Sequence, residues 1–311
     1  MKLSIIIPNF NGEGILKKNL PHVLKSIEEY EGNAELIIVD DSSVDSSVGF
    51  IGEFISKNKD FEIKLFQNET NLGFSSTVNK GARNASGDII ILLNSDVEPR
   101  PDFLKYLVKN FENDNVFATG FLDESEENGK IVKRGRGVGS IKRGFLVHRR
   151  GEIGKRNTLW AAGGSSAFRK SLWEKLGGMD EIYNPFYWDD IDLSYRALKS
   201  GYKILFEDKS VVVHRHLEGS IKNNYTEAKV KRIAYRNQFI FVWKNFELPM
   251  LVSHIAWLPY HLGKALASLN WSFLAGFLMA LIRIPKVLKS RSIAFRYFVK
   301  KDQEVVKEIS K

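Results

Sequence analysis

The sequence IIILLNSD at Ile89–Asp96 decides the predicted fold. Five consecutive branched apolar residues that end in polar ones are typical of a strand buried on both faces of a parallel sheet. Three further short apolar runs share this pattern, and apolar residues at helical spacing fill the segments between them. The runs are Leu3–Pro8, Glu35–Val39 and Glu62–Phe66, and the helical segments are 15–29, 48–56 and 74–85. This alternation predicts an α/β fold, a Rossmann-like and mostly parallel sheet with helices on both faces.

Polar residues follow three of these strands. Asn9 and Asn11 come after the first, Asp40 and Asp41 after the second, and 94–96 after the fourth. One Asp after a strand usually caps a helix or forms a turn, but three strands that deliver acids or amides to one sheet edge indicate a ligand site. Neither a Gly-x-Gly-x-x-Gly nor a Gly-Lys-Ser/Thr loop is present, which disfavours dinucleotide oxidoreductases and P-loop enzymes. A bound diphosphate would then need a cation held by carboxylates.

A second acidic cluster, FYWDDIDL at Phe186–Leu193, lies among aromatic residues. Adjacent carboxylates repel one another, and burial beside aromatic rings removes the water that would screen the repulsion. The cluster therefore indicates a metal site, a general base or a site for a substrate rich in hydroxyl groups.

Bulk composition limits the class of protein. A chain of 311 residues has room for one large domain with an appendage or for two ordinary domains. Cysteine is absent, which excludes disulfides and Cys-based metal sites and fits a reducing compartment. The first residues are too short an apolar run for a signal peptide, so we expect the catalytic part in the cytoplasm.

The net charge of +9 is concentrated in one segment. Residues 130–156 carry ten Lys or Arg, one acid and six glycines, so we expect a mobile basic loop. The loop is either simply solvated or a clamp for phosphates or an anionic membrane surface. Nucleic acid is not expected as a partner, because no recognition helix or aromatic-studded strand accompanies the charge.

Seven motifs, in this order and spacing, resemble the family 2 glycosyltransferases of the GT-A fold over about residues 3–240. They are Ser4–Asn11, Ile38–Ser43, Asn71–Phe74, Asn94–Asp96, Leu176–Glu181, Trp188–Asp192 and Val213-His214. The resemblance implies a catalytic domain at 1–237, with a nucleotide-sugar half at 1–98 and an acceptor half at 99–237. It leaves 238–311 as a helical C-terminal region.

The resemblance also implies roles for single residues. Asp41 would contact the nucleobase, and Asp190 would deprotonate the acceptor hydroxyl as general base. Asp96 and His214 would hold a divalent cation, Mg²⁺ or Mn²⁺, on the diphosphate of the donor. The implied donor site comprises Pro8, Asn9, Asn11, Asp41, Asn94, Ser95 and Asp96, and the acceptor site comprises Gly163, Gly164, Tyr187, Trp188 and Asp189.

Three positions have alternative interpretations. Asn94 stands where the stricter family motif has Asp, and an amide is a weaker, neutral ligand, so the metal would rely on Asp96, His214 and the diphosphate. A lone His after a strand is more often a packed residue than a ligand, although the ordered motifs favour His214 as a ligand. Asp192 either orients substrate or backbone or caps a helix over 193–200. A carboxylate neighbour and partial burial are expected to raise the pKa of Asp190.

The C-terminal region has a different composition. Leu248–Gly263 and Ala265–Ile282 contain no charged residue, and basic residues flank both ends. This pattern favours a re-entrant hairpin or in-plane helices on an anionic membrane surface over a single membrane span. A helical subdomain packed on the core, or a homodimer interface, is the alternative.

Taken together, the residues predict an inverting glycosyltransferase, peripheral on the inner face of the cell membrane. Its donor would be a nucleotide sugar, such as dTDP-rhamnose or a UDP-sugar. The Asn-x-Asp variant of the motif occurs among family members that resemble rhamnosyltransferases and galactofuranosyltransferases. Its acceptor would be a glycan or a lipid-linked cell-envelope precursor. The rival functions are a sugar-phosphate nucleotidyltransferase, whose Gly-rich basic N-terminal loop is missing, and a non-catalytic membrane-bound glycan-binding protein.

Overall fold

The computed structural model describes residues 1–127, 130–214 and 225–310. These residues form a nine-stranded sheet whose first four strands are parallel and lie in the order β3-β2-β1-β4. The strands are β1 (Leu3–Asn9), β2 (Ala34–Asp40), β3 (Glu62–Gln67) and β4 (Ile89–Leu93). All four predicted strands are therefore confirmed, within a residue at each end.

The second half of the chain extends the same sheet. Strand β10 (Ser165–Arg169) pairs antiparallel with β4 and with β6 (Val116–Glu127), and β11 (Lys203–His214) runs parallel to β6. The short β5 (Val97–Pro99) forms the edge beyond β11, and β7 (Lys130–Arg134) pairs with the far part of β6. The sheet is mostly parallel: β10, inserted between β4 and β6, and the peripheral strands β5 and β7 run in the reverse direction.

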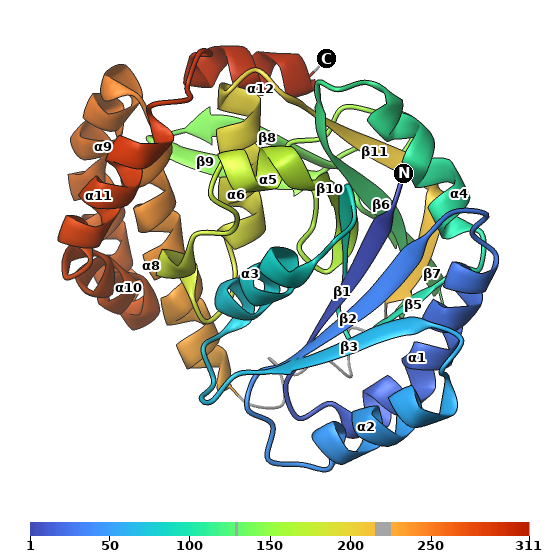
Figure 1. Cartoon of the computed structure of the whole chain (residues 1–311). Coiled ribbons are helices and arrows are strands. Elements are labelled where there is room, and N and C mark those ends of the chain that lie inside the picture. Colours follow the sequence, from blue (N-terminus) through green and yellow to red (C-terminus); the bar gives the residue numbers. More distant parts are fainter. Residues whose placement is uncertain (128–129, 215–224, 311) are drawn as a thin grey trace.

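Helices cover both faces of the sheet, as predicted (Figure 1). Helices α1 (Glu13–Glu28), α2 (Ser47–Lys57) and α4 (Phe103–Val108) cover one face. The other carries α3 (Phe74–Asn84), α5 (Lys170–Lys175) and α6 (Asp189–Lys199). Two short 3₁₀ helices lie at Lys109–Glu112 and Glu181–Tyr183. Alternate residues of β1 supply the two cores: Ile5 and Ile7 face one cluster and Ile6 the other.

The basic segment 130–156 is not the mobile loop that its glycines predicted. After β7 it forms a hairpin of β8 (Gly137–Lys142) and β9 (Phe145–Arg150), turning at Arg143 and Gly144, whose φ angles are 48° and 77°. Phe145 and Leu146 are buried and fix the hairpin to the core, which the count of charges and glycines concealed.

Five helices follow in the described residues 225–310: α8 (Glu227–Asn245), α9 (Leu248–Ala267), α10 (Trp271–Leu281), α11 (Ile284–Ala294) and α12 (Asp302–Ser310). The predicted boundary between 237 and 238 falls inside α8, and β5 spans the one between 98 and 99. In the described part of the chain, no single helix is long and apolar enough to cross a membrane. Helices α10 and α11 reach that length and composition only as a pair, and they are bent by 69°.

Candidate functional site

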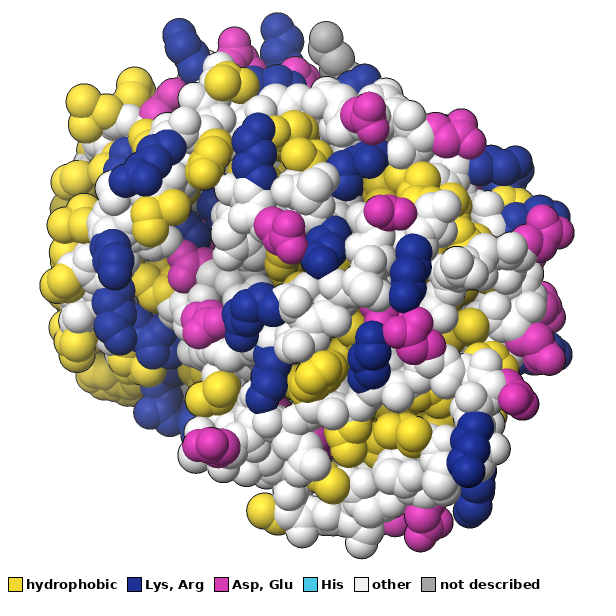
Figure 2. Space-filling model, in the orientation of Figure 1, with side chains coloured by type: hydrophobic (Ala, Val, Ile, Leu, Met, Phe, Trp, Pro, Cys, Tyr) yellow, Lys and Arg dark blue, Asp and Glu magenta, His cyan; other side chains and the backbone are white. Residues whose placement is uncertain are grey.

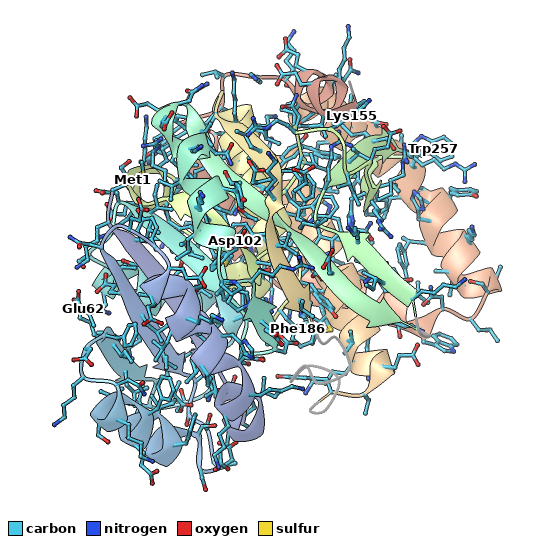
Figure 3. All side chains as sticks on the ribbon, turned by 90° about the vertical axis from the view of Figure 1, so that its right-hand side faces the viewer. Met1, Glu62, Asp102, Lys155, Phe186 and Trp257 are labelled. Atoms are coloured by element: carbon cyan, nitrogen blue, oxygen red, sulfur yellow. The ribbon has the colours of Figure 1, made fainter. Side chains whose placement is uncertain are left out.

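One cavity of about 660 Å³ lies at the carboxyl ends of β1, β2 and β4. Strand ends form one wall, and the segment before α6 forms another, so residues far apart in sequence face a common space. In Figure 3, Phe186 of this wall lies in the lower middle of the molecule, between the blue N-terminal part and the C-terminal helices on the right. The lining includes most of the predicted site: Pro8, Asn9, Asp41, Asn94, Ser95, Asp96, Gly163, Gly164, Tyr187, Asp189, Asp190 and His214.

Asn11 and Trp188 are the two predicted site residues that do not line the cavity. The side chain of Asn11 accepts a hydrogen bond from the backbone N–H of Val44, and its backbone N–H donates to Ser43. Asn11 therefore joins two strand-end loops. The ring of Trp188 is buried against Phe241 and does not reach the cavity.

Asp41 is tied to the loop that precedes α3. Its carboxylate accepts hydrogen bonds from the backbone N–H groups of Leu72 and Gly73, both at 2.9 Å, and from Asn68 at 2.8 Å. Gly73 has a φ of 87°, which a side chain would disfavour, and this conformation directs its N–H at the carboxylate. Asp41 thus sets the shape of the pocket floor from the end of β2.

Asp96, His214 and Asp123 form a carboxylate–imidazole–carboxylate chain. Nε2 of His214 lies 3.3 Å from Oδ1 of Asp96, and Nδ1 lies 2.9 Å from Oδ2 of Asp123. Burial alone would lower the pKa of His214, but the hydrogen bonds to Asp123 and Asp96 outweigh it and raise the pKa to about 9.

The arrangement of Asp96, His214 and Asp123 also fits a bound divalent cation. Two ligands at adjacent octahedral positions, each about 2.1 Å from the ion, lie about 3.0 Å apart, close to the distance between Asp96 and His214. A carboxylate on the second imidazole nitrogen, here that of Asp123, is the usual support of a metal-binding His. The described residues contain no group of three or more His, Asp or Glu arranged for a metal, so a cation here would take its remaining ligands from substrate or water.

Gly164 lies directly beneath Asn94. Asn94 donates its backbone N–H to the carbonyl of Gly164 at 2.9 Å, and any side chain at position 164 would overlap the Asn94 amide. The glycine therefore lets Asn94 reach the cavity floor at the end of β4.

Asp189 and Asp190 begin α6 side by side. Asp189 is buried and accepts a hydrogen bond from Ser75 at 3.0 Å, whereas Asp190 is partly exposed to the cavity. Burial, and then the charge of Asp190, raise the pKa of Asp189 to about 7. Burial also raises the pKa of Asp190, as expected, although the N–H groups of Gly163 and Ile191 oppose the shift.

The backbone that precedes Asp189 and Asp190 is strained, and side chains of α8 hold it in place. Tyr187 and Trp188 have φ angles of 69° and 73°, which non-glycine residues adopt at a cost of about 1–3 kcal/mol each. The amide of Asn237 donates to the carbonyls of Tyr183, Phe186 and Tyr187 at 2.8–2.9 Å. Arg236 donates to the carbonyls of residues 183 and 184. These side chains are buried and fix the approach to Asp189 and Asp190.

Asp192 does not cap a helix and does not reach the cavity. It is fully buried in α6 and bonds to Arg196 and Lys244, each at 2.7 Å, and to Tyr183 at 2.8 Å. Both interpretations of Asp192 are therefore wrong: its charge is used to bind α8 to the catalytic core. Lys244 lies 52 positions away in sequence, so local spacing gave no signal of the pair.

The sequence interpretation missed three groups at the site. Asp123 follows the apolar run of β6, so the rule that located Asp41 and Asp96 could have found it. Arg134 of β7 brings a cation to the cavity and bonds to Ser125 at 2.6 Å. Nothing in the sequence distinguishes the amide of Asn237.

The sequence model of glycosyl transferase family 2 matches residues 4–177, more than half of the chain. The probable glycosyltransferase YdaM of Bacillus subtilis strain 168 is 28% identical over 221 residues, which are 66% of this chain and 48% of that protein. An undecaprenyl-phosphate 4-deoxy-4-formamido-L-arabinose transferase of Proteus mirabilis strain HI4320 is 33% identical over 111 residues, 36% of this chain and 34% of that protein. The chain thus spans a third to a half of these relatives.

Solved structures show the same fold. GalNAc-T7, crystallised with UDP, GalNAc and Mn²⁺, superposes with a TM-score of 0.63 at 20% identity over 78% of this chain and 48% of that chain. A mannosyltransferase of Pyrobaculum calidifontis, in complex with GDP-Man and Mn²⁺, gives 0.56 at 15% identity over 94% and 84%. The GT-A fold expected from the sequence motifs is confirmed. The chain therefore belongs to glycosyl transferase family 2.

Proposed function

We propose that this protein is an inverting glycosyltransferase that moves a sugar from a nucleoside-diphosphate donor to an acceptor hydroxyl. The observation that carries the proposal is that Asp41, Asp96 and His214 line the same cavity as Asp190. Transfer of a sugar to an alcohol requires groups that bind the donor and a base near the acceptor. Here the acids on one wall would bind the donor, and a carboxylate with a raised pKa lies on another wall.

The donor wall suits a diphosphate and a divalent cation. Asp96 and His214 would hold Mg²⁺ or Mn²⁺ with Asp123 behind the imidazole, and Arg134 adds a positive charge to the same cavity. When bound, the cation neutralises the charge that develops on the leaving diphosphate. The structural neighbours named above were solved with Mn²⁺ and UDP or GDP-Man, which supports a nucleotide sugar as donor. The Asn-x-Asp motif at 94–96 makes dTDP-rhamnose or a UDP-sugar the first choice.

The acceptor wall supplies the base. Asp190 is the exposed member of its pair, and two backbone N–H groups stabilise its ionised form. Burial, and then the charge of Asp190, raise the pKa of Asp189, behind it, to about 7. An acceptor hydroxyl beside Tyr187 would therefore lose its proton to Asp190 as the sugar is transferred.

A lipid-linked cell-envelope precursor on the cytoplasmic face of the membrane is the proposed acceptor. The Proteus mirabilis relative is named as a transferase acting on undecaprenyl phosphate, which supports this class. The Gly-rich basic N-terminal loop of nucleotidyltransferases is missing, and a non-catalytic glycan-binding protein would not need Asp190.

Donor hydrolysis and binding test the proposal. We expect the full chain to show a thermal shift with one or a few nucleotide sugars, and to release free nucleoside diphosphate with Mg²⁺ or Mn²⁺ but not with EDTA. Asp96→Ala should weaken donor binding and remove the cation dependence. Asp102→Ala, which removes an exposed acid just before α4, should behave like wild type. Binding of nucleotide sugars without any turnover would support the glycan-binding alternative instead. Full activity in EDTA would exclude the cation role.

A further inference from the structure

The outermost layer of the C-terminal region exposes an unusual concentration of apolar side chains. Of 21 large apolar side chains that the described residues expose, 14 lie within 248–293, on α9, α10, α11 and their links. Figure 2 shows them as yellow side chains gathered on the left of the molecule, over these helices. Typical exposures are 59% for Ile255 and Leu278, 81% for Ile282 and 58% for Leu288. A patch of this kind marks an interaction surface. We call it the α9–α11 face.

The α9–α11 face is held rigidly to the catalytic domain. Helices α10 and α11 pack on α8, and Lys244 of α8 is joined to Asp192 of α6. Arg291 of α11 donates to the carbonyl of Phe246 at 2.6 Å, at the end of α8. The exposed apolar side chains therefore have a fixed position relative to the cavity.

Positive charge borders this face on two sides. Lys286 and Lys289 project from α11 and form no ion pair with any described residue. Arg143, at the tip of the β8–β9 hairpin, stacks over the rings of Trp257 and Tyr260 and bonds to the Tyr260 hydroxyl at 2.7 Å. Figure 2 shows dark-blue side chains along the edge of the yellow patch, and Figure 3 shows Trp257 at the outer edge.

The charge of this region has one sign. From Leu248 to Lys301 the sequence contains eight Lys or Arg and neither Asp nor Glu. If a second copy of this face covered it, the two sets of cations would meet each other, which opposes association. An anionic bilayer offers both a negative surface and an apolar layer beneath it, and Trp and Tyr commonly lie at that boundary.

We propose that the α9–α11 face docks on an anionic membrane surface, with the helices in its plane and Arg143, Lys286 and Lys289 at headgroup level. The proposal deepens the function given above and rests on it for one point only, the supply of a lipid-linked acceptor at this surface. Each exposed apolar side chain adds a small, additive share of the affinity, and each cation adds binding only to anionic lipid.

Vesicle co-sedimentation with the full chain tests the docking. We expect binding to phosphatidylcholine vesicles that contain phosphatidylglycerol, much less to phosphatidylcholine alone, and a blue shift of the fluorescence of exposed Trp257 and Trp271 on binding. The triple variant Ile255→Gln/Leu278→Gln/Leu288→Gln should partition at least about tenfold more weakly. The matched triple Val44→Gln/Ile131→Gln/Val299→Gln, exposed elsewhere, should bind like wild type.

The charged border is tested separately. Lys286→Gln/Lys289→Gln should lower affinity for the anionic vesicles by roughly 30-fold and leave binding to neutral vesicles unchanged. Lys59→Gln/Lys105→Gln, which removes two exposed lysines on other elements, should have little effect.

Two results would overturn the docking proposal: wild type that stays in the supernatant with both vesicle types, or a C-terminal triple variant that binds as well as wild type. A dimer in light scattering that this same triple variant dissociates, without vesicle binding, would assign the face to a second copy. Nucleotide-sugar hydrolysis, measured without vesicles, keeps the two proposals apart. Vesicle binding without hydrolysis refutes only the proposed function, and hydrolysis without vesicle binding refutes only the docking.

Discussion

The acidic cluster at the start of α6 contributes to two regions that differ in charge balance: one contains acids without a cationic partner, and the other contains an acid paired with cations. Asp189 and Asp190 line the cavity, and no Lys or Arg of the described residues forms an ion pair with either. Asp192 lies on the inner side of the same helix and meets Arg196 and Lys244. Burial raises the pKa of Asp189 and Asp190. Lys244 and Arg196 outweigh burial at Asp192 and lower its pKa.

The presence or absence of a cationic partner separates acids that stabilise the fold from acids that can take part in a reaction. Asp192, with Asp180 and Lys244, connects α6 to α8, and Asp302 joins Lys199 of α6 to the start of α12. Each of these carboxylates is matched by a cation, whose attraction offsets at least part of the cost of burying the charge. The unmatched pair is retained at a cost in stability, which is typical of a reactive site.

The largest effect is expected at the unmatched, exposed acid. Asp190→Asn removes the proposed base but keeps the size of the side chain, so transfer should fall about 1,000-fold or more in kcat. Donor affinity, measured by titration calorimetry, should stay near the wild-type value because Asp190 lies on the wall proposed for the acceptor. Turnover within tenfold of wild type would rule out Asp190 as the base.

The matched region should respond in stability. Lys244→Met leaves Asp192 buried without its cation and should lower the free energy of unfolding by about 3–5 kcal/mol in urea denaturation. Adding Asp192→Asn to this variant should recover part of the loss, since the uncompensated charge is then removed. Lys231→Met, which breaks an exposed ion pair on the same helix, is the control and should change stability little. A loss no larger than the control's would contradict the matched-charge interpretation.

The link between the regions is the amide of Asn237. Asn237→Ala removes the donors that hold the carbonyls of 183, 186 and 187, so Asp190 should lose its fixed position and kcat should fall roughly 10–100-fold. The KM for donor should not change. Asn245→Ala removes another fully buried amide of α8, one that bonds to Asp192. Equal losses of kcat in the two variants would show that Asn237 acts only through stability.

The features that could be predicted from the sequence are those encoded by residues close together in the chain. The strands that end in Asp41 and Asp96, and the acids at 189–190, are each recognisable within about eight residues, and the structure brings them to one cavity. The partner of Asp192 is 52 residues away, and the hairpin after β7 depends on burial of Phe145 rather than on its glycines. Such long-range contacts leave no local pattern, which is why the interpretation of Asp192 and the basic loop failed.

The smallest effect on activity, and the most diagnostic effect on stability, is expected at Asp189. Asp189→Asn keeps the contacts to Ser75 and to the N–H of Asp190 but removes the titration that burial shifts from 3.8 to about 7. Because the folded pKa is raised, the wild type binds the proton more tightly when folded, and it loses stability as the pH rises from about 4 to about 7. The variant lacks this loss, so its melting temperature should exceed that of wild type increasingly over this range and keep a constant lead above it, while most transfer activity remains. A constant difference in melting temperature at every pH would mean that Asp189 does not titrate, and the contrast between the unmatched and matched acids would then rest on Asp190 alone.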